Sequence, residues 1–105
     1  MNQQVMLRKI QKMQKEMMDT QKEIDESVFS ATAGGVVTVE MYGTKELKAV
    51  NISKDFELEG EEDYEMLSDM IVAACNEAYN KIDKTTKEKM GKYQALLGGM
   101  GGGLF

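Results

Sequence analysis

The sequence predicts an α/β domain with a long N-terminal helix, a three-stranded antiparallel meander and a long C-terminal helix. Apolar residues repeat with a helical period in residues 2–26 and again from about residue 63 to about residue 97. Residues 27–53 are instead rich in β-branched residues separated by glycine-containing turns. The chain has 105 residues and no proline, so we expect one domain with uninterrupted helices. We place this domain at residues 1–97 and a flexible, glycine-rich tail at residues 98–105.

Residues 2–26 predict a single long helix. Good helix formers (Gln, Lys and Glu) separate its apolar positions, which repeat at spacings of four and three residues. This seam consists of Met6, Ile10, Met13, Met17, Thr20 and Ile24. The helix would be roughly 37 Å long at about 1.5 Å per residue, whereas a compact chain of this size has a radius of gyration of about 13 Å. We therefore expect the helix to overhang the domain or to pack against a second chain in a homodimer.

Residues 27–53 predict three short strands. We expect the strands at residues 27–31, 36–42 and 47–53, with turns at residues 32–35 and 43–45. Such short turns make neighbouring strands antiparallel. Alternation along the middle strand puts Val37 and Val39 on the same face, and we assign both to the core or the dimer interface. The other face of this strand is also partly apolar, so we expect the sheet to be covered on both sides.

The second long helix is predicted to follow an acidic connector at residues 54–65. Its apolar stripe consists of Leu67, Ile71, Ala74, Ala78, Ile82 and Thr85. Beyond Ile82 the stripe continues as Lys89 and Lys92, with Lys81 beside it. An apolar stripe that becomes basic is typical of a helix that leaves its core and points toward an anionic partner. A charged face that is merely solvated is the alternative interpretation.

Charge is unevenly distributed along the chain, although the net charge is −5. The two ends are basic and the middle is acidic. The candidate basic residues are Arg8, Lys9, Lys12, Lys15, Lys81, Lys84, Lys87, Lys89 and Lys92. If the two long helices pack antiparallel, their basic ends coincide in space and the acidic connector lies at the opposite end.

Composition excludes several classes of function. The chain has no histidine, which excludes a Ser-His-Asp triad, a Cys-His dyad and any His-ligated metal site. Its single cysteine cannot form an internal disulfide and is typical of a reducing compartment such as the cytoplasm. No apolar run reaches the roughly 20 residues of a membrane span, and no signal peptide is apparent. We expect no enzymatic activity, cofactor, metal, small-molecule substrate or membrane association.

Several segments together resemble a known family. They are Gly-Gly-Val-Val-Thr-Val-Glu-Met-Tyr-Gly at residues 34–43, Val-Asn-Ile at residues 50–52, Glu-Met-Leu-Ser-Asp at residues 65–69 and Val-Ala-Ala-Cys-Asn-Glu-Ala at residues 72–78. With the Met/Gln/Lys-rich opening helix, they resemble the YbaB/EbfC nucleoid-associated proteins over nearly the whole chain. One departure from the family is the absence of proline in the connector and tail.

The resemblance implies a small homodimer whose long helices project from a central sheet like tweezer arms. It also implies binding of double-stranded DNA with low sequence specificity, and a role in organising the bacterial nucleoid or affecting gene expression. The DNA contacts would then be the basic residues of the two helices given above. The alternative is a non-catalytic dimeric scaffold that binds another protein through its Met-rich helices.

Overall fold

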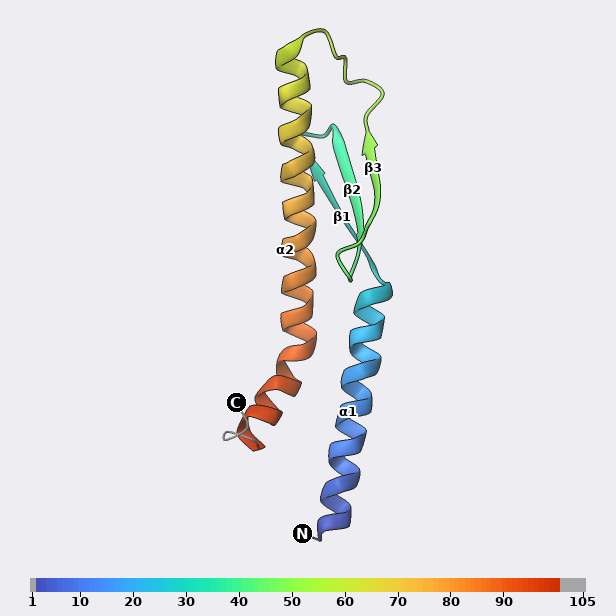
Figure 1. Ribbon diagram of the computed structural model, residues 1–105, viewed down its shortest axis with the longest axis vertical. Helices are drawn as coiled ribbons and strands as arrows, with labels where there is room; N and C mark the ends of the chain where they lie inside the picture. The colour runs from blue at the N-terminus through green and yellow to red at the C-terminus, as the bar shows by residue number, and fades with distance from the viewer. Residues whose placement is uncertain (1, 101–105) are drawn as a thin grey trace.

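A computed structural model describes residues 2–100 and confirms the predicted order of elements. These elements are α1 (Gln3–Glu26), β1 (Val28–Ala33), β2 (Val37–Tyr42), β3 (Leu47–Ile52) and α2 (Glu61–Met100). The molecule is elongated, with extents of 72 × 24 × 16 Å. The sheet lies beside the first half of α2, and α1 runs from one end of the sheet along the second half of α2, antiparallel to it (Figure 1).

The first helix overhangs the sheet, as its length predicts. The radius of gyration of the Cα atoms is 20.3 Å, well above the roughly 13 Å of a compact chain of this size. Asn2 caps the helix by accepting a 3.0 Å hydrogen bond from the Val5 backbone N–H. Ile24 is the one buried residue of α1 and lies at the end nearest the sheet. The apolar seam therefore emerges from the core toward the N-terminus, and its first member, Met6, is exposed.

The three strands form one antiparallel sheet in the order β1-β2-β3. The first predicted turn began too early. Thr32 and Ala33 belong to β1 and pair with Thr38 and Val37 of β2. The turn between β1 and β2 is short because Gly34 and Gly35 both adopt positive φ values, 58° and 68°, which glycine accepts more readily than other residues.

The core lies between one face of the sheet and α2. Its buried members are Ala31, Val37, Val39, Met41, Ala74, Ala78 and Ile82. The alanines on α2 let the helix approach the sheet closely, so that the β-branched residues of β2 fill the space between them. The core thus joins alternate residues of β2 to the predicted apolar stripe of α2.

The helix α2 packs mainly against β1 and β2. The register places Val50 opposite Val39 and Ile52 opposite Val37, so these β3 residues share the α2-facing side of the sheet. They nevertheless remain 37% and 45% exposed. An apolar strip of the sheet is therefore uncovered in the single chain.

The second helix is longer than predicted at both ends. It begins at Glu61 rather than near Asp63, and it continues through residues 98–100, where we expected the tail to begin. The remaining tail residues, 101–105, lie outside the described part of the chain. Figure 1 shows that the axis of α2 bends in its C-terminal third. Neither helix has a stretch within residues 2–100 that is long and apolar enough to cross a membrane.

Candidate nucleic-acid interface

The start of α1 and the end of α2 enclose a groove at the end of the molecule remote from the connector. Because the helices are antiparallel and in contact, the two basic segments lie next to each other (Figure 1). The groove has a volume of about 300 Å³. It is lined by Lys9, Lys12, Met13, Glu16, Lys92, Tyr93 and Leu96. Three of the nine candidate basic residues therefore meet around one groove, with Glu16 as its only acidic member.

Tyr93 is the functional candidate that sequence reasoning missed. It is 4% exposed, although it lies beyond the sheet. The Lys92 ammonium nitrogen lies 4.9 Å from the centroid of the Tyr93 ring, close enough for a cation–π interaction. The signal was present in the sequence, because Tyr93 follows Ile82 by eleven residues, or about three helical turns. Tyr93 therefore lies on the side of α2 that carries the core residues and extends this buried side into the groove. Its buried ring packs against the Lys92 ammonium group.

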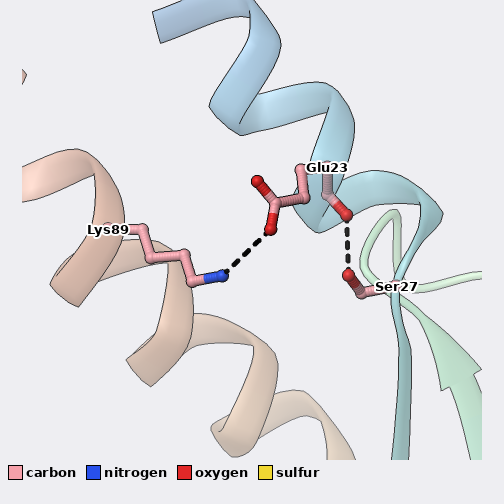
Figure 2. Close-up of polar contacts among 3 residues, drawn as sticks. All are labelled: Glu23, Ser27 and Lys89. Atoms are coloured by element: carbon pink, nitrogen blue, oxygen red, sulfur yellow. Dashed lines mark hydrogen bonds and ion pairs between the residues drawn. The ribbon is translucent and has the colours of Figure 1, made fainter. Parts of the chain in front are cut away.

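Lys89 has a different environment from the lysines of the groove. Its Nζ atom lies 3.7 Å from an Oε1 atom of Glu23, so the two helices are joined by an ion pair (Figure 2). The backbone carbonyl of Glu23 also accepts a 2.7 Å hydrogen bond from the Ser27 hydroxyl at the end of α1. An exposed pair of this kind contributes at most about 1 kcal/mol. Glu23 also offsets the positive charge of Lys89, which makes this lysine a tether between the helices.

Two further candidate lysines already have partners. The Lys81 ammonium donates a 2.6 Å hydrogen bond to the backbone carbonyl of Ser30 and so links α2 to β1. Lys15 lies 4.0 Å from Asp19 on the following turn of α1. The Asp19 carboxylate partly offsets the charge of Lys15, whereas the carbonyl contact leaves the charge of Lys81 intact and holds its ammonium group at β1.

The remaining candidates lie outside the groove. Lys84 and Lys87 line a separate depression on α2 together with Asp83, Thr86 and Gln94. At about 100° per residue, they lie about 80° and 140° around the helix from Lys92. The candidate basic residues therefore do not form one continuous patch.

The opposite end of the molecule is acidic. The connector before α2 and the first turn of the helix, with Glu61, Glu62 and Asp63, lie at the end remote from the groove (Figure 1). Carboxylates in a first turn are favoured by the helix dipole. Within residues 2–100, no group of three or more Cys, Asp or Glu side chains is arranged to hold a metal ion. Charge is therefore separated along the long axis.

The direction of α1 is set where the helix meets the sheet. Gly43 lies against the last turn of α1, where a Cβ atom would overlap the backbone carbonyl of Ile24. The Gly43 N–H also donates a 3.0 Å hydrogen bond to the carbonyl of Ser27. Together with the buried Ile24 side chain, this close approach orients α1 so that its basic end reaches α2.

The comparison with protein families matches nearly the whole chain. Residues 1–98 match the YbaB/EbfC DNA-binding family. The chain belongs to this family. A nucleoid-associated protein from Lachnospira eligens is 48% identical over 86 residues, which cover 81% of this chain and 72% of that protein. A nucleoid-associated protein from Lactococcus lactis subsp. cremoris is 42% identical over 94 residues, which cover 89% of this chain and 93% of that protein.

The fold of this YbaB/EbfC family member also has a counterpart among solved structures. The crystal structure of an uncharacterized protein from Helicobacter pylori, HP0035, superimposes with a TM-score of 0.69. The alignment covers 90% of this chain and 98% of that protein at 20% sequence identity. At this identity the likeness concerns the fold alone.

Proposed function

We propose that this protein is a nucleoid-associated protein of the bacterial cytoplasm that binds double-stranded DNA with low sequence specificity. The groove between the two helices carries the proposal, because Lys9 and Lys12 of α1 meet Lys92 of α2 there. A chain with a net charge of −5 has no general affinity for DNA. Separation of charge along the molecule gives one end a locally positive surface in spite of this.

Binding of this kind is directed to the phosphate backbone. Lysine ammonium groups neutralise phosphates and release condensed counterions, which supplies affinity without reading bases. The groove offers lysines, which bind phosphates as point charges, and apolar walls, and its lining lacks the Asn or Gln that would pair with adenine and the Arg that would pair with guanine. Membership of a DNA-binding family supports this function.

Affinities for two unrelated duplexes of equal length test the proposal. We expect both to bind in the same concentration range, within about threefold, because phosphate contacts carry no sequence information. Absence of binding at low salt would contradict the proposal. A preference above about 100-fold would contradict its nonspecific mechanism, because it requires base contacts.

We further propose that the protein acts as a homodimer. The uncovered strip of β3, formed by Leu47, Val50 and Ile52, offers an apolar surface that a second copy would bury. Each dimer would then present two pairs of helical arms to DNA.

Replacing Val50 with Glu tests the dimer. We expect the variant to shift from dimer to monomer, because the interface would have to bury an unpaired carboxylate. Asn51→Glu is the matched control, since the side chain of residue 51 points to the other face of the sheet. Light scattering of each variant gives the mass. A wild-type protein that is a folded monomer at low micromolar concentration would exclude the dimer.

Neutralising the acidic connector should strengthen DNA binding modestly. The substitutions are Asp55→Asn, Glu57→Gln, Glu59→Gln and Glu61→Gln. The connector and the start of α2 lie at the end of the molecule remote from the groove (Figure 1), so repulsion from their carboxylates acts only at long range and is screened by salt. We expect an affinity gain of about two- to threefold at low salt that disappears at high salt. A loss of binding would instead assign these residues a direct role.

The alternative function is a scaffold that binds another protein. The exposed apolar depression on α1 that includes Met6 and Leu7 favours it, since contiguous exposed apolar surface commonly marks a protein-interaction site. Salt distinguishes the two functions, because an apolar interface is much less sensitive to salt than contacts to phosphates.

A further inference from the structure

We propose that the acidic end of this protein docks the N-terminal turns of α1 from a second molecule. The contact would assemble molecules head to tail. It would also use the same basic residues that face DNA, so assembly and DNA binding would compete. The docking does not depend on DNA binding, whereas the competition rests on the function proposed above.

The receiving surface is a groove of about 530 Å³ at the start of α2, beside the turn between β1 and β2. Its lining residues are Ala33, Gly34, Glu62, Glu65, Met66, Asp69, Met70 and Ala73. Three carboxylates therefore surround two thioethers and small residues, with no basic side chain among them. Among residues 2–100, none of the three carboxylates takes part in an ion pair. The groove is both negatively charged and apolar.

The floor of this groove is suited to an apolar side chain. The backbone of Gly34 lies so close to Met70 that a Cβ atom would come within 2.6 Å of its sulfur. Met66 is 52% exposed at the rim. Methionine side chains are flexible and polarisable, so they adapt to the shape of a docked helix.

The start of α1 has the complementary chemistry. Residues 2–15 include four basic residues and no acidic one. Gln3, Met6, Leu7 and Ile10 line an apolar depression on one side of this segment, and Leu7 is 56% exposed. At about 100° per residue, Lys9 lies about 110° to one side of this depression and Arg8 about 150° to the other, so the two flank the apolar side of the helix. A basic amphipathic helix placed in an acidic, methionine-lined groove is a recurrent mode of recognition.

The contact must form between molecules. The acidic groove and the start of α1 lie at opposite ends of a molecule 72 Å long (Figure 1). The two surfaces are also different patches, so each contact leaves one groove and one α1 end available. A heterologous contact of this kind extends into an open chain unless its rotation closes a ring.

Sedimentation velocity of the full chain tests the docking. In wild type at low salt, we expect the average mass to rise with protein concentration beyond that of the proposed dimer. At high salt we expect it to fall back to the mass of the dimer. Glu62→Lys with Glu65→Lys should weaken this association at least about tenfold, or about 1.4 kcal/mol. Glu57→Lys with Glu59→Lys is the matched control, because it makes the same charge change at the same end outside the groove. We expect the control to weaken association less than about threefold.

A mixing experiment removes the remaining ambiguity. Arg8→Glu with Lys9→Glu should also prevent assembly, and mixing this variant with Glu62→Lys/Glu65→Lys should restore pairing, because each supplies the charge that the other lacks. Leu7→Gln should weaken association without changing charge. Circular dichroism confirms that each variant is folded.

Three outcomes would overturn the docking. They are a wild type that does not assemble at low salt, a control variant that loses assembly as fully as the groove variant, and variants that do not pair when mixed. Duplex DNA should disperse the assemblies. If assembly occurs but DNA has no effect on it, the docking stands and the competition is excluded.

Discussion

Reversing the charge of Lys12 and Lys92 is expected to reduce DNA affinity by about 100-fold at low salt. Each lysine that contacts a phosphate would contribute about 1.4 kcal/mol, which corresponds to a factor of ten. The substitutions are Lys12→Glu and Lys92→Glu, one on each wall of the groove. Fluorescence anisotropy with a labelled duplex gives the affinity. Circular dichroism should show an unchanged fold, since exposed charge changes usually alter stability by less than about 0.5 kcal/mol.

A matched double variant on α2 distinguishes binding in the groove from general electrostatic attraction. Lys84→Glu with Lys87→Glu makes an equal charge change in a depression outside the groove. We expect this control to lose about tenfold or less. Lys89 is not a suitable target, because a carboxylate there would face Glu23 and disturb the contact between the helices. Equal losses in the two double variants would show that contacts are spread around both helices, and unchanged affinity in Lys12→Glu/Lys92→Glu would remove the groove from the DNA site.

Replacing Gly43 with Ala is expected to destabilise the fold by about 3 kcal/mol. The new methyl group would overlap the backbone carbonyl of Ile24, and the last turn of α1 can relieve this overlap only by moving away from the sheet. Since Ile24 is buried in this turn, movement would also expose apolar surface. Urea denaturation followed by circular dichroism measures the free energy of unfolding.

Gly91→Ala is the matched control for this substitution. Gly91 lies in the interior of α2 with nothing within 4 Å of an added Cβ atom. Alanine is the better helix former, so we expect a stabilisation of about 1 kcal/mol. The same chemical change should therefore have opposite effects at the two positions. A Gly43→Ala protein as stable as wild type would contradict a close approach between α1 and the sheet.

Local periodicity was sufficient to predict the elements and most of the core. Val37 and Val39 were assigned to the core or the dimer interface from alternation alone, and both are buried in the core of the single chain. The order of elements also followed from the sequence, because an apolar period of two between two helical periods has few interpretations. The first turn was placed too early because pairing of Thr32 and Ala33 with β2 depends on the register of the hairpin, which composition does not fix.

The basic site was less predictable, because it depends on which residues of two helices meet. The sequence identified both lysine clusters, yet it did not separate Lys92, which lines the groove, from Lys89, which pairs with Glu23. These two lysines lie on the same predicted stripe, and only the position of α1 gives them different partners. Tyr93 was missed for a related reason, since its burial comes from the contact with α1 beyond the end of the sheet.

The salt dependence of DNA affinity tests the central claim most directly. The measurement is the slope of the logarithm of the association constant against the logarithm of salt concentration for the wild-type protein. Each neutralised phosphate contributes about −0.9, so three lysine contacts from one chain predict a slope of about −2.7 and six from a dimer predict about −5.4. We expect a slope in this range that is the same for unrelated duplexes. A slope close to zero would contradict the proposal that lysines of the helical arms bind the phosphate backbone.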